Sequence, residues 1–184
     1  MYKILKAEKL AANIFLMDVE APRVAKHCLP GQFVIVKMDE EGERIPLTIC
    51  DYDAEKGIVT IVFQPIGAST MKMAELQAGD SFEDFVGPLG KPSEFTEMDL
   101  DELKKKRIVF VAGGVGTAPV YPQVKWLHEH GITADAIVGA KTKDLVILEE
   151  EMSKVCNLYV TTDDGSYVRK GMGTDVLRDL VQNQ

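Results

Sequence analysis

The sequence has few cysteines, and they do not form a pattern typical of disulfides or zinc sites. Cys28, Cys50 and Cys156 are an odd number of thiols, and no two are separated by a short ligand spacing. This scarcity excludes a disulfide framework and is typical of a reducing compartment, so we expect a cytoplasmic protein. We expect no metal site in this chain.

Positive charge and long apolar runs are also scarce. The 21 basic and 29 acidic residues give a net charge of −8. Nucleic acids and anionic membranes bind positive surfaces, so we expect neither as a partner. The longest uncharged run, residues 108–124, contains three glycines and two prolines, which excludes a membrane span. The amino terminus lacks the apolar core of a signal peptide.

The usual catalytic constellations are missing as well. His27, His128 and His130 are scattered, and no Ser–His–acid set or Cys-x-x-Cys pair is apparent. Residues 163–165, Asp-Asp-Gly, are more typical of a turn than of a cation site. The chemistry is therefore expected to depend on an organic cofactor.

What the first half does contain is a series of short β-type runs. Apolar and polar residues alternate with period two, which predicts strands at residues 3–8, 13–19, 32–37, 45–50 and 57–63. Turn dipeptides separate these runs, and one helix is predicted over residues 69–76. Many short strands with a single helix indicate an antiparallel β-barrel, which we assign to residues 1–98.

The second half has a different pattern, which begins after an acidic stretch. After Arg107, its first strand is apolar, as expected of a buried parallel strand. Three strand–helix pairs follow one another, with strands at 107–112, 134–139 and 157–161 and helices at 118–130, 145–154 and 173–181. This order predicts a partial, doubly wound α/β domain over residues 104–184.

Two glycine-bearing segments lie where the chain enters a predicted helix. Residues 112–119 offer close backbone approach and a helix start, which suits a pyrophosphate. Pro119 replaces the third glycine of the dinucleotide fingerprint, so a tight turn without a ligand is the alternative. In residues 64–70, Ser69 and Thr70 are either helix caps or phosphate ligands.

Arg44 and the strand after it form a further candidate site. A guanidinium binds phosphate in bidentate fashion, although an arginine before a strand is often just a solvated end. Pro46 removes a backbone donor, and the Thr48 hydroxyl is small enough to face a flat ring. Residues 86–92, rich in glycine and proline, fit either a turn between domains or part of the site.

Four motifs in this order resemble those of the ferredoxin–NADP reductase superfamily. They are Arg44-x-Pro46-Leu47-Thr48, Gly67-x-Ser69-Thr70, Gly87-Pro88-Leu89-Gly90 and the Gly-Gly-Val-Gly-Thr-Ala-Pro of residues 113–119. Within the superfamily, the chain is similar to the small flavin subunits of NADH-dependent ferredoxin:NADP oxidoreductases, also called sulfide dehydrogenase small subunits, and to the electron-transfer subunits of dihydroorotate dehydrogenase. The resemblance implies an FAD-binding β-barrel followed by a nicotinamide-nucleotide domain.

The resemblance also implies roles for single residues. Arg44 would hold the FAD phosphates, and Thr48 would lie near the redox-active N5 as the catalytic position. The other FAD-binding residues would be Pro46, Leu47, Val62, Phe63, Gln64, Gly67, Ser69 and Thr70. The residues facing NAD(H) or NADP(H) would be Gly114, Val115, Gly116 and Thr117. Lys141 would approach the adenosine end of that nucleotide or remain a solvated loop residue.

The implied function is that of a flavoprotein electron-transfer subunit, passing electrons from NAD(P)H through FAD to an iron–sulfur partner. That partner would be a larger iron–sulfur or flavin oxidoreductase subunit or a ferredoxin-type carrier. Members of the family continue to a four-cysteine iron–sulfur cluster whose ligands are absent here, so we expect a C-terminally truncated member without that cluster. Truncation leaves open whether the chain is active alone.

Two other functions are alternatives to this one. A non-catalytic flavin- or nucleotide-binding module, serving as an assembly subunit of a larger oxidoreductase, is the main alternative. A plain NAD-dependent dehydrogenase is disfavoured, because Pro119 interrupts the fingerprint and the barrel would have no role.

Overall fold

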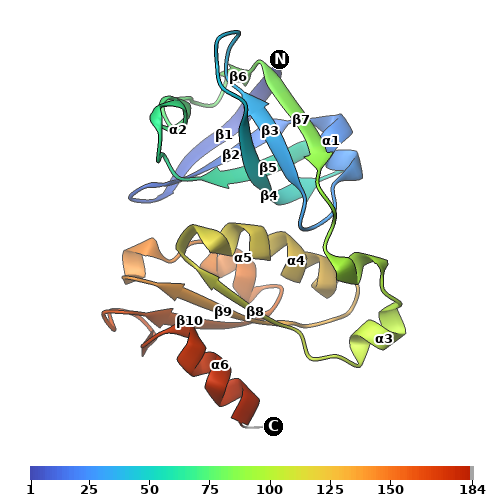
Figure 1. The fold of residues 1–184 in the computed structure, drawn as a ribbon, viewed down its shortest axis with the longest axis vertical. Helices are drawn as coiled ribbons and strands as arrows, with labels where there is room; N and C mark the ends of the chain where they lie inside the picture. Colours follow the sequence, from blue (N-terminus) through green and yellow to red (C-terminus); the bar gives the residue numbers. More distant parts are fainter. Residues whose placement is uncertain (183–184) are drawn as a thin grey trace. The chain divides into compact units, whose positions relative to one another are not determined.

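The computed structural model, described for residues 1–182, divides into two compact units. The first comprises Met1–Thr96 and the second begins at Glu97. The first unit contains strands β1 (Tyr2–Ala11), β2 (Ile14–Glu20), β3 (Phe33–Lys37), β4 (Ile45–Asp53), β5 (Ile58–Phe63), β6 (Ser81–Phe82) and β7 (Asp84–Leu89), with helices α1 (Pro22–His27) and α2 (Ala68–Met73) (Figure 1). A 3-10 turn, η1 (Glu94–Glu97), follows them.

The strands of the first unit curl into a nearly closed antiparallel barrel. Their order is β6-β1-β2-β5-β4-β3-β7, and every named pair in it is antiparallel. The strands at its two ends, β6 and β7, are joined by Glu83 alone. Since a one-residue link cannot cross a flat seven-stranded sheet, the sheet must bring its edges together. The predicted antiparallel barrel is confirmed.

One continuous apolar core fills this barrel. Alternate residues of the strands point inward, and the largest fully buried ones include Phe82, Phe85 and Ile61. Helix α1 adds Val24 and Ala25 to the same core cluster. The barrel is thereby a rigid support for the loops at its ends.

The second unit is a parallel sheet with helices. Its elements are α3 (Leu100–Lys104), β8 (Val109–Gly113), η2 (Gly114–Gly116), α4 (Thr117–Glu129), β9 (Asp135–Ala140), η3 (Lys143–Leu145), α5 (Glu149–Ser153), β10 (Asn157–Thr162), β11 (Arg169–Lys170) and α6 (Gly173–Gln182). The strand order is β11-β10-β9-β8, and all three pairings are parallel. The expected partial α/β architecture is confirmed for the described residues.

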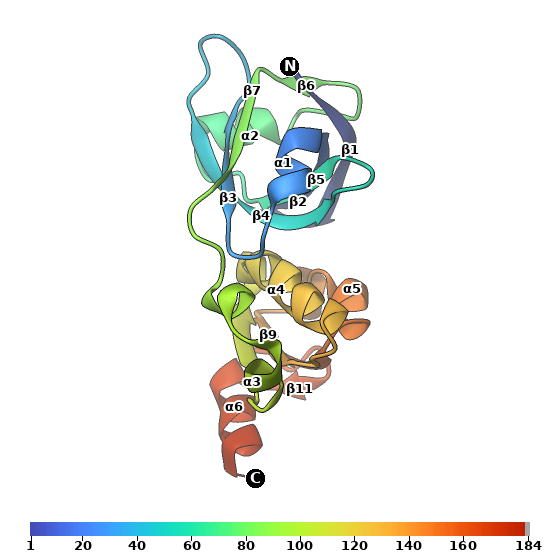
Figure 2. The same ribbon diagram turned by 90° about the vertical axis from the view of Figure 1, so that its right-hand side faces the viewer.

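Helices cover both faces of this sheet. Helices α4 and α5 lie on one face, whereas α6 lies on the other, as both views show (Figures 1 and 2). Gly173, the first residue of α6, packs so closely that an added Cβ would lie 3.2 Å from Ile137 Cγ2. Because β8, β9 and β10 are parallel, their carboxyl ends lie at the same edge of the sheet. Open α/β sheets bind ligands at this edge.

Some local elements differ from those expected from the sequence. Helix α1 was not expected, because six residues are too few to show a helical period. Residues 84–89 form strand β7, which was not expected, because residues 86–92 were assigned either to a turn between domains or to the site. The helix expected over residues 145–154 is only Glu149–Ser153, preceded by the 3-10 turn η3.

Candidate flavin site and nucleotide turn

A cavity of about 450 Å³ in the first unit joins residues from two of the sequence motifs. Strands β4 and β5 are antiparallel neighbours, so the start of β4 lies beside the end of β5. The loop after β5 then leads into α2. The cavity is lined by Glu43, Arg44, Ile45, Pro46, Leu47, Phe63, Gln64, Ile66, Gly67, Ala68, Ser69 and Thr70.

Eight of the residues expected to bind FAD are in this lining: Arg44, Pro46, Leu47, Phe63, Gln64, Gly67, Ser69 and Thr70. Thr48, two residues after Pro46 in β4, is exposed and lies opposite Phe33 of β3. It is not in the lining. Val62 is buried opposite Leu16 of β2, also outside the lining. Most of the residues expected to bind FAD therefore line one cavity, and Thr48 and Val62 lie outside its lining.

The lining has an apolar part that suits an aromatic ring. Phe63 stacks on Phe15, with 5.8 Å between ring centroids, and is itself buried. Ile66 is 79% exposed, and Pro46 is also exposed. Ile66 and Pro46 therefore present apolar surface in the cavity wall. Sequence reasoning overlooked Ile66, although its place in the Gln-Pro-Ile-Gly segment was visible.

The charged part of the lining consists of Arg44 and Glu43. Arg44 Nη2 lies 2.8 Å from Asp84 Oδ2 at the start of β7, and both side chains are partly exposed. This ion pair holds the guanidinium at the cavity, where its remaining N–H groups can reach a phosphate. Asp84, like Glu43, was not identified from the sequence.

Two hydroxyl groups at the start of α2 have defined partners. Ser69 Oγ donates to Glu43 Oε2 at 2.5 Å. Thr70 Oγ1 accepts from the backbone N–H groups of Ile66 and Gly67, at 2.9 and 3.0 Å. Thr70 therefore fixes the loop at the start of α2, which combines the cap role considered for it with a place in the cavity wall.

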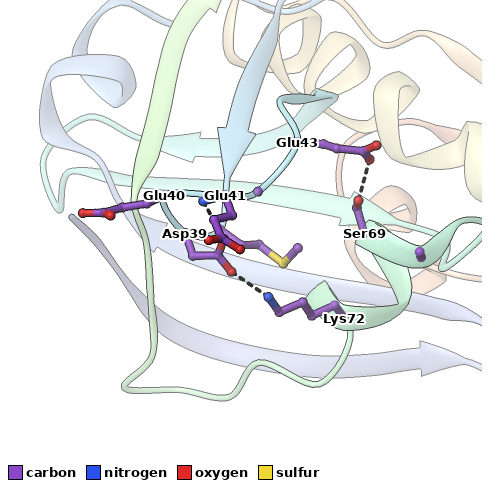
Figure 3. Close-up of a pocket in the computed structure, with 9 residues that line it drawn as sticks. Asp39, Glu40, Glu41, Glu43, Ser69 and Lys72 are labelled. Atoms are coloured by element: carbon purple, nitrogen blue, oxygen red, sulfur yellow. Dashed lines mark hydrogen bonds and ion pairs between the residues drawn. The ribbon is translucent and has the colours of Figure 1, made fainter.

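A second, acidic cavity of about 660 Å³ shares the residues Glu43, Ala68 and Ser69 with the first. The loop between β3 and β4 forms most of it, and Figure 3 shows its side chains. Lys72 Nζ lies 2.6 Å from Asp39 Oδ2. This hydrogen bond lowers the pKa of Asp39 and raises that of Lys72. The loop is thus tied to α2 by a charged pair at neutral pH.

In the second unit, the glycine-rich turn connects β8 to α4 at the carboxyl edge of the sheet. Gly114 has φ of +53°, which glycine adopts without steric cost. No atom lies within 4 Å of a Cβ built at Gly114 or Gly116. The four residues expected to face a nicotinamide nucleotide, 114–117, form the 3-10 turn η2 and the first residue of the 13-residue helix α4.

Thr117 supplies an unusual feature of this turn. It is fully buried, and within the described part of the chain its Oγ1 has no hydrogen-bond partner. Lys141 is exposed directly after β9, at the same edge of the sheet. The positions of both residues suit the ligand edge of a parallel sheet.

The cysteines lie in the interior. Cys28, Cys50 and Cys156 are all buried, and none of the three is in a disulfide. Burial raises the pKa of Cys28 to about 12 and that of Cys156 to about 11. In residues 1–182, no three His, Cys, Asp or Glu side chains are arranged to hold a metal ion. None of the helices described there is long and apolar enough to cross a membrane.

Comparison with known proteins gives named relatives over almost the whole chain. A Clostridium beijerinckii protein called "Uncharacterized protein in adh 3'region" is 64% identical over 185 residues, covering 100% of this chain and 62% of that protein. The Thermotoga maritima dihydroorotate dehydrogenase B (NAD(+)) electron transfer subunit homolog is 37% identical over 182 residues, 99% of this chain and 62% of its own length. The corresponding Streptococcus pneumoniae subunit is 33% identical over 180 residues, 97% of this chain and 70% of that protein.

This chain belongs to the family of dihydroorotate dehydrogenase B electron transfer subunits. It spans 62% of the length of the first two relatives. No family model matches the sequence. The membership confirms the resemblance to the ferredoxin–NADP reductase superfamily inferred from the four motifs.

A solved structure agrees with this assignment. The NADH-dependent reduced ferredoxin-NADP oxidoreductase, studied for flavin-based electron bifurcation, has a chain that superposes with a TM-score of 0.90 at 37% identity. The match covers 100% of this chain and 64% of the other. The ferredoxin-NADP⁺ reductase of Plasmodium falciparum, at 12% identity and a TM-score of 0.76, shares the fold.

Proposed function

We propose that this chain is a flavoprotein electron-transfer subunit that passes electrons from NAD(P)H through FAD to an iron–sulfur partner. The observation that carries the proposal is the cavity of the first unit, which is lined by residues of both the Arg44 motif and the Gly67 motif. Membership in a family of electron transfer subunits supports it independently.

The cavity has the features that FAD requires. Its apolar wall, with Pro46 and Ile66, suits the isoalloxazine ring, and the Arg44 guanidinium suits the diphosphate. Ser69 and the Gly67 backbone would bind the phosphates from the side of α2. Leu47, Phe63, Gln64 and Thr70 would complete the contact, with Val62 supporting the wall and Thr48 placed near N5 on the exposed side of β4.

The second unit would bind the pyridine nucleotide at the carboxyl edge of its sheet. Gly114, Val115 and Gly116 would let the backbone approach the ligand, and the Thr117 hydroxyl would gain a partner. Lys141 would meet the adenosine end. We accordingly assign residues 1–98 to FAD binding and residues 104–184 to NAD(P)H binding.

FAD, when bound, would supply the chemistry of accepting a hydride and donating single electrons. The residues of this chain bind and orient the two cofactors, so no general base is required. The partner would be a larger iron–sulfur or flavin subunit or a ferredoxin-type carrier, in the cytoplasm.

The test is the affinity of the purified chain for FAD, measured by titration. We expect binding by the wild type and a dissociation constant about 10- to 100-fold higher for Arg44→Ala, because a hydrogen bond to a charged group is worth about 1.5–3 kcal/mol. Arg23→Ala, which removes the same charge from α1 at a distance from the cavity lining, is the matched control. Equal FAD affinity in Arg44→Ala and wild type would remove the phosphate clamp from the proposal.

A second candidate is a non-catalytic flavin- or nucleotide-binding module that serves as an assembly surface. The observation in its favour is that β8 is a terminal strand of the second sheet and that its Val111 is 48% exposed. Such a module would bind FAD without being reduced by NAD(P)H.

A further inference from the structure

Glu43 lies where an anionic ligand would be expected to meet only positive or neutral groups. It lines both the FAD cavity and the acidic cavity beside it. Its carboxylate accepts the hydrogen bond of Ser69 Oγ at 2.5 Å, as Figure 3 shows. A serine hydroxyl has one proton to donate. Ser69 can therefore donate to a phosphate only after it releases Glu43.

Arg44 has a carboxylate partner as well. Its Nη2 lies 2.8 Å from Asp84 Oδ2, and Asp84 is 37% exposed. Both side chains best suited to bind a phosphate, Arg44 and Ser69, thus already contact an acidic residue of the same unit. The two differ in one respect: the guanidinium has further N–H groups to donate, whereas the Ser69 hydroxyl has no second proton.

The formal charges of the cavity wall cancel. Among its lining residues, only Arg44 and Glu43 are charged. A bound phosphate would therefore lie close to one positive and one negative side chain. Because two like charges a few ångströms apart repel by about 1–4 kcal/mol near a protein surface, Glu43 opposes every phosphate charge placed beside Ser69.

We propose that Glu43 is a specificity-determining residue that competes with the cofactor phosphate for Ser69. The inference rests on the proposed FAD site. The diphosphate diester of FAD carries one charge on each phosphorus, whereas the phosphomonoester of FMN carries about −1.5 to −2 on one phosphorus at pH 7. Glu43 therefore lowers the affinity for both cofactors but disfavours FMN more. It selects the dinucleotide over the mononucleotide.

The experiment measures dissociation constants for FAD, FMN and riboflavin with the wild type and with Glu43→Gln. The substitution keeps the shape and a hydrogen-bond acceptor but removes the charge. We expect FAD to bind at least about 5-fold more tightly, FMN to gain more than FAD, and riboflavin, which has no phosphate, to be unchanged.

The matched control is Glu40→Gln in the same loop. Its carboxylate points away from Ser69 in Figure 3, so this variant, with the same change of net charge, should behave like the wild type. In a Ser69→Ala background, the gain from Glu43→Gln should shrink, since the contested donor is gone.

Three results would overturn the inference: FAD affinity equal in Glu43→Gln and Glu40→Gln, a gain for riboflavin as large as that for FAD, or a gain for FMN no larger than that for FAD. If the wild type binds no FAD at all, the proposed function itself fails. If the wild type binds FAD in an Arg44-dependent way and Glu43→Gln binds no more tightly, only the present inference fails.

Discussion

Arg44 and Glu43 are adjacent in the chain, yet only Arg44 could be identified from the sequence. A guanidinium before a Pro-Leu-Thr strand belongs to a motif, whereas a glutamate in the acidic run 39–43 resembles an ordinary solvated loop residue. What distinguishes Glu43 is its contact with Ser69, 26 residues further along. A side-chain contact over that distance depends on the fold and leaves no local pattern.

Cys28 gives a prediction about pH at the scale of a single residue. Its pKa is about 12 in the fold and 9.0 without burial, so above pH 9 the unfolded chain loses this proton first. The native state then binds more protons, and stability falls as pH rises. The contribution of the neutral thiol is complete below pH 9 and is lost as the pH rises from 9 towards 12.

We expect the free energy of unfolding of the wild type to fall more steeply between pH 8 and pH 10 than that of Cys28→Ala. The difference in slope approaches about 1.4 kcal/mol per pH unit above pH 9. Urea unfolding at several pH values measures it. Parallel curves for the two proteins would show that the thiol titrates normally in the fold.

At the scale of elements, the turn between β8 and α4 contains two glycines with different requirements. Gly114 has φ of +53°, and Gly116 has φ of −63°. A Cβ would meet no atom within 4 Å at either position. Alanine substitutions at these two positions therefore test the effect of backbone conformation in the absence of steric clashes.

We expect Gly114→Ala to destabilise the protein by about 1–2 kcal/mol, because an L-residue in the left-handed region carries that cost. Gly116→Ala should be neutral or stabilising by up to about 1 kcal/mol, since its backbone is already helical. Urea unfolding followed by the fluorescence of Trp126, which lies in α4 and is the chain's single tryptophan, measures both. Equal losses for the two variants would contradict the assigned role of φ at Gly114.

Elements with a clear period were predictable, and short ones were not. Strands β1 to β5 and helix α4 follow from alternation and helical spacing. Strand β7 was missed because Gly87 and Pro88 are typical of turns. Here Gly87 is needed because an added Cβ would lie 2.8 Å from Val34 Cγ1, and proline is tolerated in a strand at the end of the sheet order.

At the scale of the whole molecule, both units contribute a cofactor site to the proposed function. The first unit supplies the cavity with Arg44, and the second supplies the glycine turn before α4. Neither unit alone has candidate residues for both cofactors.

We expect NADH, added without oxygen to the FAD-loaded chain, to bleach the visible absorbance of the flavin, because hydride transfer requires only FAD and the nicotinamide. Stopped-flow absorbance measures the rate. Gly114→Ala, with its distorted turn, should slow bleaching while leaving FAD affinity unchanged. A chain that retains FAD but is not bleached by NADH would favour the assembly module.

The sequence by itself determined the fold class and most of the candidate site, because hydrophobic periodicity and ordered glycine motifs are local properties of the chain. The tertiary structure alone decided which side chains meet. The antiparallel pairing of β4 with β5 places the start of β4 beside the loop before α2. It thereby brings Glu43 to Ser69, places Ile66 in the cavity wall and leaves Thr48 outside the lining. These contacts depend on strand register and curvature, which arise from packing across the whole barrel.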